Sequence, residues 1–148
     1  MNKTKLDFFT KIEEEDIILA IQNAEVDSSG QVRVHIDDVC EGEVMERAYE
    51  VFHKLGIQNT KLRNGVLFYL AAKNRKFAVI ADDGINDAVA DDFWDEIKQM
   101  LLNYFRDEKF AEGLTEAIIK SGEQLKRYFP NGSDAKNELP DEISYGNL

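Results

Sequence analysis

The stretch GVLFYLAAKNRKFAVIADD, residues Gly65 to Asp83, is the part of the sequence that determines the expected fold. Gly65 to Ala72 is a continuous apolar run rich in strand-forming residues, which is typical of a strand covered on both faces. Lys73 to Lys76 is a short polar turn, and Phe77 to Ala81 is the returning strand of a hairpin. The first of these strands is therefore expected at the centre of a sheet.

Apolar residues recur at helical spacing in the segments that flank the hairpin, which predicts four helices. The first helix begins at Thr10, whose spacing to Glu13 fits a capping box. In the third helix Phe93 is expected in the core, in line with Ile97, whereas its neighbour Trp94 is expected to be partly exposed. The predicted helices cover residues 10–27, 43–56, 91–107 and 109–128.

The alternating segment Gln31 to Ile36 adds a strand before the second helix. A strand, helix, strand connection within one sheet is normally a right-handed parallel crossover, so this strand should run parallel to the strand at 65–72. The hairpin then reverses the third strand. This order of elements is that of an α/β protein with a mixed sheet.

The topology divides the acidic residues near the strands into two groups. Asp82 and Asp83, at the exit of the third strand, should lie at the same sheet edge as Asn64, which precedes the second strand. Asp37 and Asp38 should lie at the opposite edge. A haloacid-dehalogenase-like phosphatase needs a second acid two residues after the first, where this chain has valine, so Asp37 and Asp38 are expected to be solvated.

The length and composition predict one domain followed by a tail. With 148 residues, of which 43% are hydrophobic, the chain has enough apolar surface for one packed core. Residues 1–130 are therefore expected to form a single domain. Residues 131–148 contain few large apolar side chains, four acids and one lysine, so they are predicted to be a flexible acidic tail.

The charge balance excludes some partners and favours others. The 18 basic and 29 acidic residues give a net charge of −11, which repels phosphate backbones and argues against nucleic-acid binding. The same charge favours cations and basic protein surfaces. No stretch has the length of a membrane span or the apolar region of a signal peptide, so a cytoplasmic protein is expected.

Nucleophilic catalysis has no support in the sequence. No GxSxG motif is present, and the single cysteine, Cys40, forms neither a metal cluster nor a recognisable pair with His35 or His53. Because Cys40 has no second cysteine with which to form an internal disulfide bond, the fold does not depend on an oxidising compartment.

The segment from Ile80 to Ile97 is the best candidate for a binding site, because it holds seven acids in eighteen residues. Carboxylates are the hard oxygen ligands that Ca2+ and Mg2+ require. The alternative is that these acids are N-caps and turn residues, such as Asp91 before the third helix. An EF-hand is excluded, because Gly84 at its sixth position would place Val79 at the first ligand position.

Several segments resemble the TPM domain family. The resembling segments are NGVL at Asn64–Leu67, RKFAVI at Arg75–Ile80, Gly84, Asp91, FAEGL at Phe110–Leu114, and AEVDSSGQVRV upstream. The resemblance covers roughly residues 12–130. It implies a three-layer α/β/α sandwich with Rossmann-like connectivity and a small mixed central sheet, which agrees with the order of elements.

The resemblance also implies a type of function. Several members of the family bind calcium or similar ions, a plant thylakoid-lumen member is described as an acid phosphatase, and many bacterial members are membrane-tethered. Much of the family carries an acid directly before the NG pair, where this chain has Arg63. The cation ligands expected in this chain are Asn64, Asp82, Asp83, Asp87 and Asp91.

Three functions remain open from the sequence. The leading prediction is a domain that binds Ca2+ or Mg2+. The second is a metal-assisted phosphomonoesterase, in which the cation polarises the phosphoryl oxygens and a neighbouring aspartate orients water. The third is an acidic interaction module that binds a basic protein partner without metal.

Overall fold

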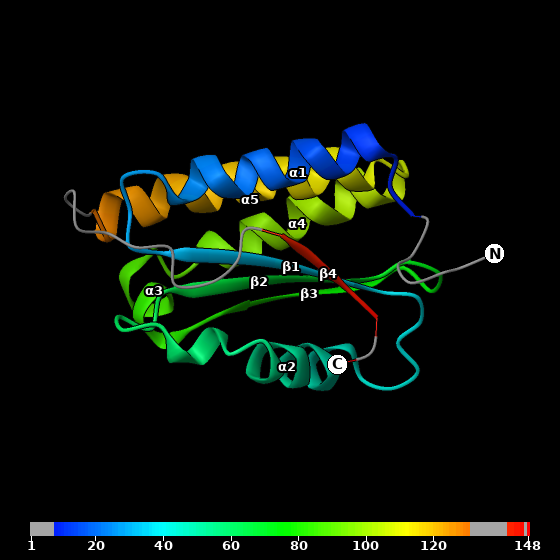
Figure 1. Ribbon diagram of the computed structural model, residues 1–148, viewed down its shortest axis with the longest axis horizontal. Helices are drawn as coiled ribbons and strands as arrows, with labels where there is room; N and C mark the ends of the chain where they lie inside the picture. The colour runs from blue at the N-terminus through cyan, green and yellow to red at the C-terminus, as the bar shows by residue number, and fades with distance from the viewer. Residues whose placement is uncertain (1–7, 131–141, 147) are drawn as a thin grey trace.

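The computed structural model describes residues 8–130, 142–146 and 148, which form a four-stranded mixed sheet between two layers of helices (Figure 1). The helices are α1 (Lys11–Glu25), α2 (Val44–Lys54), the 3-10 helix η1 (Ile57–Asn59), α3 (Asp83–Ala88), α4 (Phe93–Arg106) and α5 (Phe110–Tyr128). The strands are β1 (Gln31–Asp37), β2 (Gly65–Ala71), β3 (Lys76–Ala81) and β4 (Ile143–Tyr145). The expected three-layer α/β/α architecture is confirmed.

β2 lies inside the sheet, in the strand order β3-β2-β1-β4. β1 and β2 run parallel, with Gln31 opposite Gly65 and Asp37 opposite Ala71. β3 returns antiparallel to β2. Every residue of β1 and β2 is buried, because helices cover both faces of the sheet. The predicted parallel crossover and the predicted hairpin are therefore both confirmed.

Side chains alternate along β2 and enter two separate cores. Val66, Phe68 and Leu70 belong to the larger core, on the face covered by α1, α4 and α5. Leu67 and Tyr69 belong to the smaller core, on the face covered by α2. β2 thus contributes side chains to the cores on both faces of the sheet.

α1 and α5 pack side by side over one face of the sheet (Figure 1). A Cβ atom at Gly122 of α5 would lie 2.6 Å from the Cβ atom of Ala24 on α1, so glycine permits this close approach. The two helices therefore form one tightly packed pair with a shared outward side. Neither these helices nor any other in the described part of the chain is apolar over a length that spans a bilayer.

The C-terminal part of the chain differs from the prediction. Residues 131–141 lie outside the described residues, but Ile143–Tyr145 form β4, which pairs parallel to β1 with Val34 opposite Ile143. A flexible tail is therefore wrong for residues 142–146. The physical reason is that β1 would otherwise be an unpaired edge strand. β4 pairs with this strand, and the side chain of Ile143, at 8% exposure, is buried in the core.

The apolar face of α4 agrees with the prediction at Ile97 and Leu101 but differs at its first turn. Trp94, Ile97, Leu101 and Phe105 are buried, whereas Phe93 is only partly buried. The expectation that Trp94 is the more exposed of the two aromatic residues is wrong, because the stripe through Ile97 and Leu101 continues to Trp94 at one end and Phe105 at the other.

Candidate functional site

Asp82 lies at the end of β3 and forms the N-cap of α3, at the sheet edge that the topology predicted. Its carboxylate is buried, with 5% residue exposure, and accepts the backbone N–H of Asp83 at 2.8 Å. Arg63 donates to both carboxylate oxygens, from Nε to Oδ2 and from Nη2 to Oδ1, each at 2.7 Å. The hydrogen bonds to Asp82, and the charges of Asp82 and Asp83, raise the pKa of the Arg63 guanidinium. Asp82 is therefore a buried carboxylate whose charge is balanced by one arginine.

The segment before β2 packs directly against α3. The carbonyl oxygen of Arg63 accepts the N–H of Gly84 at 2.8 Å and the N–H of Ile85 at 3.3 Å. Gly84 has no room for a side chain, because an added Cβ atom would lie 2.1 Å from the Leu62 carbonyl oxygen and 2.6 Å from that of Arg63. These contacts fix the backbone of Arg63 beside Asp82.

We expect Gly84→Ala to lower the free energy of unfolding by about 1 to 3 kcal/mol, because the added methyl group meets backbone atoms that must move. Urea denaturation measures this change. Gly42→Ala is the matched control, because a Cβ atom added there meets nothing within 4 Å. The control should change stability by less than about 0.5 kcal/mol. Equal effects at the two glycines would contradict the close packing at Gly84.

Asn64 is the second buried polar residue at this edge, with 1% exposure. Its backbone carbonyl accepts the N–H of Gln31 at 3.3 Å, and its side-chain Nδ2 donates to Ser29 Oγ at 3.0 Å. Its side-chain oxygen Oδ1 is buried and has no hydrogen-bond partner among the described residues. The next residue, Gly65, accepts the Asp82 N–H at 3.0 Å. Because a buried carbonyl oxygen without a donor is costly, Asn64 Oδ1 is a candidate ligand atom.

The remaining predicted ligands are exposed. Asp83 and Asp87 lie one turn apart on α3, and Asp91 lies in the turn before α4. Asp91 does not cap α4, because the N-cap position is Asp92, whose side chain makes no capping hydrogen bond. Within residues 8–130, 142–146 and 148, no three acidic, histidine or cysteine side chains are placed to share a metal ion. The predicted ligand set is therefore not assembled into a ready-made cage.

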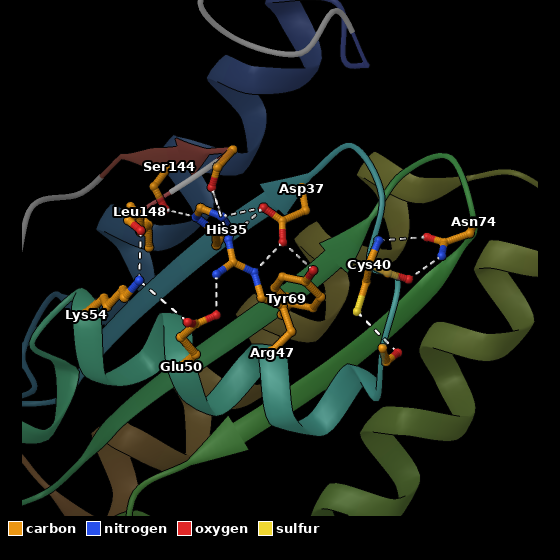
Figure 2. A network of polar contacts seen from close by, with 12 residues as sticks. His35, Asp37, Cys40, Arg47, Glu50, Lys54, Tyr69, Asn74, Ser144 and Leu148 are labelled. Atoms are coloured by element: carbon orange, nitrogen blue, oxygen red, sulfur yellow. Dashed lines mark hydrogen bonds and ion pairs between the residues drawn. The ribbon is translucent and has the colours of Figure 1, made fainter.

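A second polar cluster lies at the opposite edge, where β1 ends (Figure 2). Asp37 is 5% exposed, so the expectation that it is solvated is wrong. Arg47 of α2 donates to the Asp37 carboxylate from Nε at 2.7 Å and from Nη2 at 3.2 Å. The Tyr69 hydroxyl donates to the same carboxylate at 2.5 Å, and His35 Nε2 lies 3.0 Å from it. Asp37 can be buried because α2 places a guanidinium over the end of the strand.

The surroundings of Asp37 stabilise its charged form. Burial alone would raise the pKa of this carboxyl, but the hydrogen bonds from its three neighbours together hold the pKa well below its usual range. The hydrogen bond to Asp37 likewise raises the pKa of the Arg47 guanidinium. Burial and the hydrogen bond to Asp37 raise the pKa of the Tyr69 phenol. At neutral pH the cluster therefore holds a carboxylate and a guanidinium, both charged.

His35 connects this cluster to β4. Its Nε2 faces two acceptors, the Asp37 carboxylate and the Gly146 carbonyl oxygen at 2.9 Å, so Nε2 carries a hydrogen. Its Nδ1 lies 2.6 Å from Ser144 Oγ. Serine hydrolases place the nitrogens the other way round, with Nε2 toward serine and Nδ1 toward the acid. Arg47 also donates to the Gly146 carbonyl at 3.3 Å, so these contacts hold β4 against β1 and have a structural role.

Arg47 and Ser144 carry no pattern in the sequence that marks them as members of this cluster. The one available signal is the period-two alternation of β1, in which His35 and Asp37 share a face. A polar face of this kind is usually exposed to water. In this fold it is buried, and its polar groups find partners on α2 and β4.

Known proteins share the sequence pattern of this chain. Residues 3–124 match the family model of the TPM domain. The chain belongs to the TPM domain family. The resemblance carried by the segments around Asn64 and Phe110 is thereby confirmed. Among proteins with curated descriptions, none matches this chain.

Solved structures agree with the TPM fold. The NMR structure of the BA42 protein from the psychrophilic bacterium Bizionia argentinensis shares 44% identity and a TM-score of 0.88, covering 99% of this chain and 100% of that one. The N-terminal domain of a P. gingivalis protein shares 18% identity at TM-score 0.68, covering 85% and 83% of the two chains. The N-terminal domain of the cg2496 protein from Corynebacterium glutamicum shares 13% identity at TM-score 0.65, covering 88% and 81%. At these two lower identities the likeness concerns the fold alone.

Proposed function

We propose that this TPM domain binds a divalent cation, Ca2+ or Mg2+, at the sheet edge that holds Asn64, Asp82 and Asp83. The observation that supports this proposal is the Asn64 Oδ1 atom, which is buried at this edge without a hydrogen-bond donor among the described residues. Ca2+ takes about six to eight oxygen ligands, including carboxylates, amide carbonyls and waters, and Mg2+ keeps several waters. Neither ion therefore requires a complete cage of protein ligands.

In the absence of a cation, Arg63 is the counter-ion of Asp82. Its side chain is 50% exposed, whereas the side chain of Asp82 is 4% exposed. The guanidinium can therefore rotate into water while the carboxylate stays in place. A cation that replaces the guanidinium keeps the buried charge compensated, which avoids the cost of an unpaired buried carboxylate. Cation binding and the pairing of Arg63 thus compete for Asp82.

The exposed acids of the segment contribute in two ways. The charges of Asp83, Asp87 and Asp91 attract cations toward this end of the sheet, within a chain of net charge −11. Their carboxylates also accept hydrogen bonds from water, including the water molecules of a bound cation. They serve the proposed site as outer ligands, with Asn64 and Asp82 as the inner ones.

Saturating Ca2+ is expected to stabilise the protein, because a ligand that binds only the folded state adds about 2.7 kcal/mol at 100 times its Kd. Thermal unfolding of the full chain with and without Ca2+, and then with Mg2+, measures this gain. Asp82→Asn should abolish the gain. Arg63→Gln should lower the Kd, since the competing guanidinium is gone. Asp95→Asn, which changes an exposed carboxylate on α4, is the charge-matched control and should keep the full gain.

Two results would contradict this arrangement. A gain of unchanged size in Asp82→Asn would place the cation elsewhere in the chain. Weaker binding in Arg63→Gln would mean that the guanidinium supports the site rather than competing for it.

A metal-assisted phosphomonoesterase is the catalytic alternative, and it depends on the same edge. The observation in its favour is the exposed Arg63 guanidinium, which suits phosphate oxygens once it leaves Asp82. Hydrolysis of p-nitrophenyl phosphate by the full chain, with and without Mg2+, tests this alternative. Hydrolysis that requires Mg2+ and is lost in Arg63→Gln supports the enzyme. If Mg2+ promotes no hydrolysis, the enzyme is rejected and cation binding stands unaffected.

A further inference from the structure

A groove of about 570 Å3 lies between α1 and α5 on their solvent-exposed side, and Tyr104 of α4 also lines it. None of the residues that line the groove belongs to the polar clusters around Asp82 or Asp37. The side chains that give it its chemistry are Glu13, Asp16 and Leu19 of α1 and Glu112, Glu116 and Ile119 of α5.

The walls of this groove carry one sign of charge. α1 contributes Glu13 and Asp16, and α5 contributes Glu112 and Glu116. No lysine, arginine or histidine of the described chain lines the groove. Carboxylates on both walls of a concave surface focus a negative potential into it and attract basic groups.

The groove also carries exposed apolar side chains. Leu19 of α1 is 54% exposed and Ile119 of α5 is 42% exposed, and both line the groove. Leu19 follows Asp16 by three residues and Ile119 follows Glu116 by three, so an acid and an aliphatic side chain share a face on each helix. A ligand that covers both helices therefore meets apolar surface between acidic groups.

We propose that this groove binds a basic amphipathic helix of a partner protein. Two helices packed side by side leave a groove that a third helix fills by placing its side chains between theirs. The apolar face of the partner covers Leu19 and Ile119, and its lysines or arginines meet the surrounding carboxylates. This occupant satisfies both properties of the groove at once.

The length of the groove and the net charge of the chain indicate which kind of partner fits. The lining of α1 runs from Glu13 to Asn23, which is about 15 Å of helix at 1.5 Å per residue. A partner segment of roughly three helical turns matches this length. A second copy of this chain is disfavoured as the occupant, because each copy carries a net charge of −11. The inference does not rest on cation binding at Asn64 and Asp82.

A designed peptide tests the proposal with the full chain. The probe is a fluorescein-labelled helix of about eleven residues, or three turns, made of leucine and lysine, with its leucines at i, i+3, i+4 and i+7. Fluorescence anisotropy should show saturable binding, and the amide signals that shift should lie in α1 and α5. A scrambled peptide of the same composition, whose leucines share no face, should bind at least about tenfold more weakly.

Two charge-matched variants distinguish binding at the groove from attraction by the net charge of the chain. The groove variant replaces three acids: Asp16→Asn, Glu112→Gln and Glu116→Gln. The control variant removes the same number of charges from exposed acids in and just before the first turn of α2, which covers the other face of the sheet: Glu41→Gln, Glu43→Gln and Glu46→Gln. The groove variant should weaken peptide binding at least about tenfold, and the control by less than about twofold.

The apolar contacts have their own test. Leu19→Ser combined with Ile119→Ser should also weaken binding at least about tenfold, and both side chains are exposed enough to be changed without loss of the fold. Equal weakening by the groove and control variants would show that the peptide responds only to net charge, which overturns the proposal. Unchanged binding in the serine variant, or amide shifts confined to α2, would overturn it as well.

Discussion

Replacing Asp37 with alanine is expected to lower the free energy of unfolding by about 3 to 5 kcal/mol. The substitution removes the acceptor for the Arg47 guanidinium, whose side chain is 19% exposed. It also removes the acceptor for the Tyr69 hydroxyl, which belongs to a residue with 1% exposure. A buried Tyr69 hydroxyl without an acceptor, and an Arg47 guanidinium that keeps only Glu50 and the Gly146 carbonyl, cost more than these hydrogen bonds contribute in the intact cluster. Urea denaturation measures the loss.

Asp38→Ala is the matched control for this prediction. Asp38 is the next residue along the chain, its side chain is 46% exposed, and it pairs with Lys73, whose side chain is 70% exposed. Exposed pairs of this kind contribute no more than about 1 kcal/mol. A loss at Asp37 as small as the loss at Asp38 would mean that the cluster at the end of β1 does not support the fold.

The same carboxylate makes stability depend on pH. The pKa of Asp37 is lower in the folded protein than in the unfolded chain, so the unfolded state takes up the proton first as the pH falls. The stability contributed by Asp37 is complete above the unfolded-state pKa of about 3.9 and is lost progressively as the pH falls below it. The stability difference between the wild type and Asp37→Asn should therefore stay constant from pH 7 to about pH 5 and then shrink. A difference that grows toward acidic pH would contradict this assignment.

Deleting residues 142–148 is expected to lower the free energy of unfolding by about 3 to 5 kcal/mol. Burial of the Ile143 side chain accounts for about 2 kcal/mol of this loss. The remainder comes from the edge of β1 and from His35 and Arg47, which lose Ser144 and the Gly146 carbonyl. Thermal unfolding measures the effect, and deletion of residues 147–148 alone is the control. A truncated chain as stable as the control would restore the view that the C-terminal segment is a flexible tail.

The sequence predicts the central part of the fold because the apolar patterns there are long. The run from Gly65 to Ala72 is apolar throughout, and burial on both faces is the only arrangement that removes it from water. The parallel pairing of β1 and β2 then follows from the handedness of the crossover through α2. These inferences need no knowledge of individual side-chain contacts.

β4 could not be predicted in the same way. Ile143–Tyr145 is too short to show a period, and only Ile143 is a large aliphatic residue. What makes this segment a strand is the edge of β1, which lies more than a hundred residues earlier in the chain. The burial of Trp94 could not be predicted for a related reason, since two adjacent aromatic residues leave the register of a helix face ambiguous until its neighbours are known.

At both sheet edges, strand direction predicts which residues lie together, but not which side chains pair with them. The placement of Asn64 with Asp82 follows from strand direction alone and is confirmed by the hydrogen bond between Asp82 and Gly65. The pairing of Arg63 with Asp82 depends on how the loop before β2 packs on Gly84, and no local pattern encodes that packing. Arg47 reaches Asp37 from α2, and no local pattern in the sequence encodes this contact either.

Backbone amide chemical shifts during a Ca2+ titration of the full chain test whether the cation binds at Asn64 and Asp82. Signals from residues 62–65 and 82–91 should shift along one saturable curve as Ca2+ displaces Arg63 from Asp82. Signals around Asp37 and Ser144, at the opposite edge, should stay in place. The same titration of Asp82→Asn should leave residues 62–65 and 82–91 unchanged. If Ca2+ at millimolar concentration shifts no signals, or shifts those around Asp37 first, the cation site is not at the Asn64 and Asp82 edge.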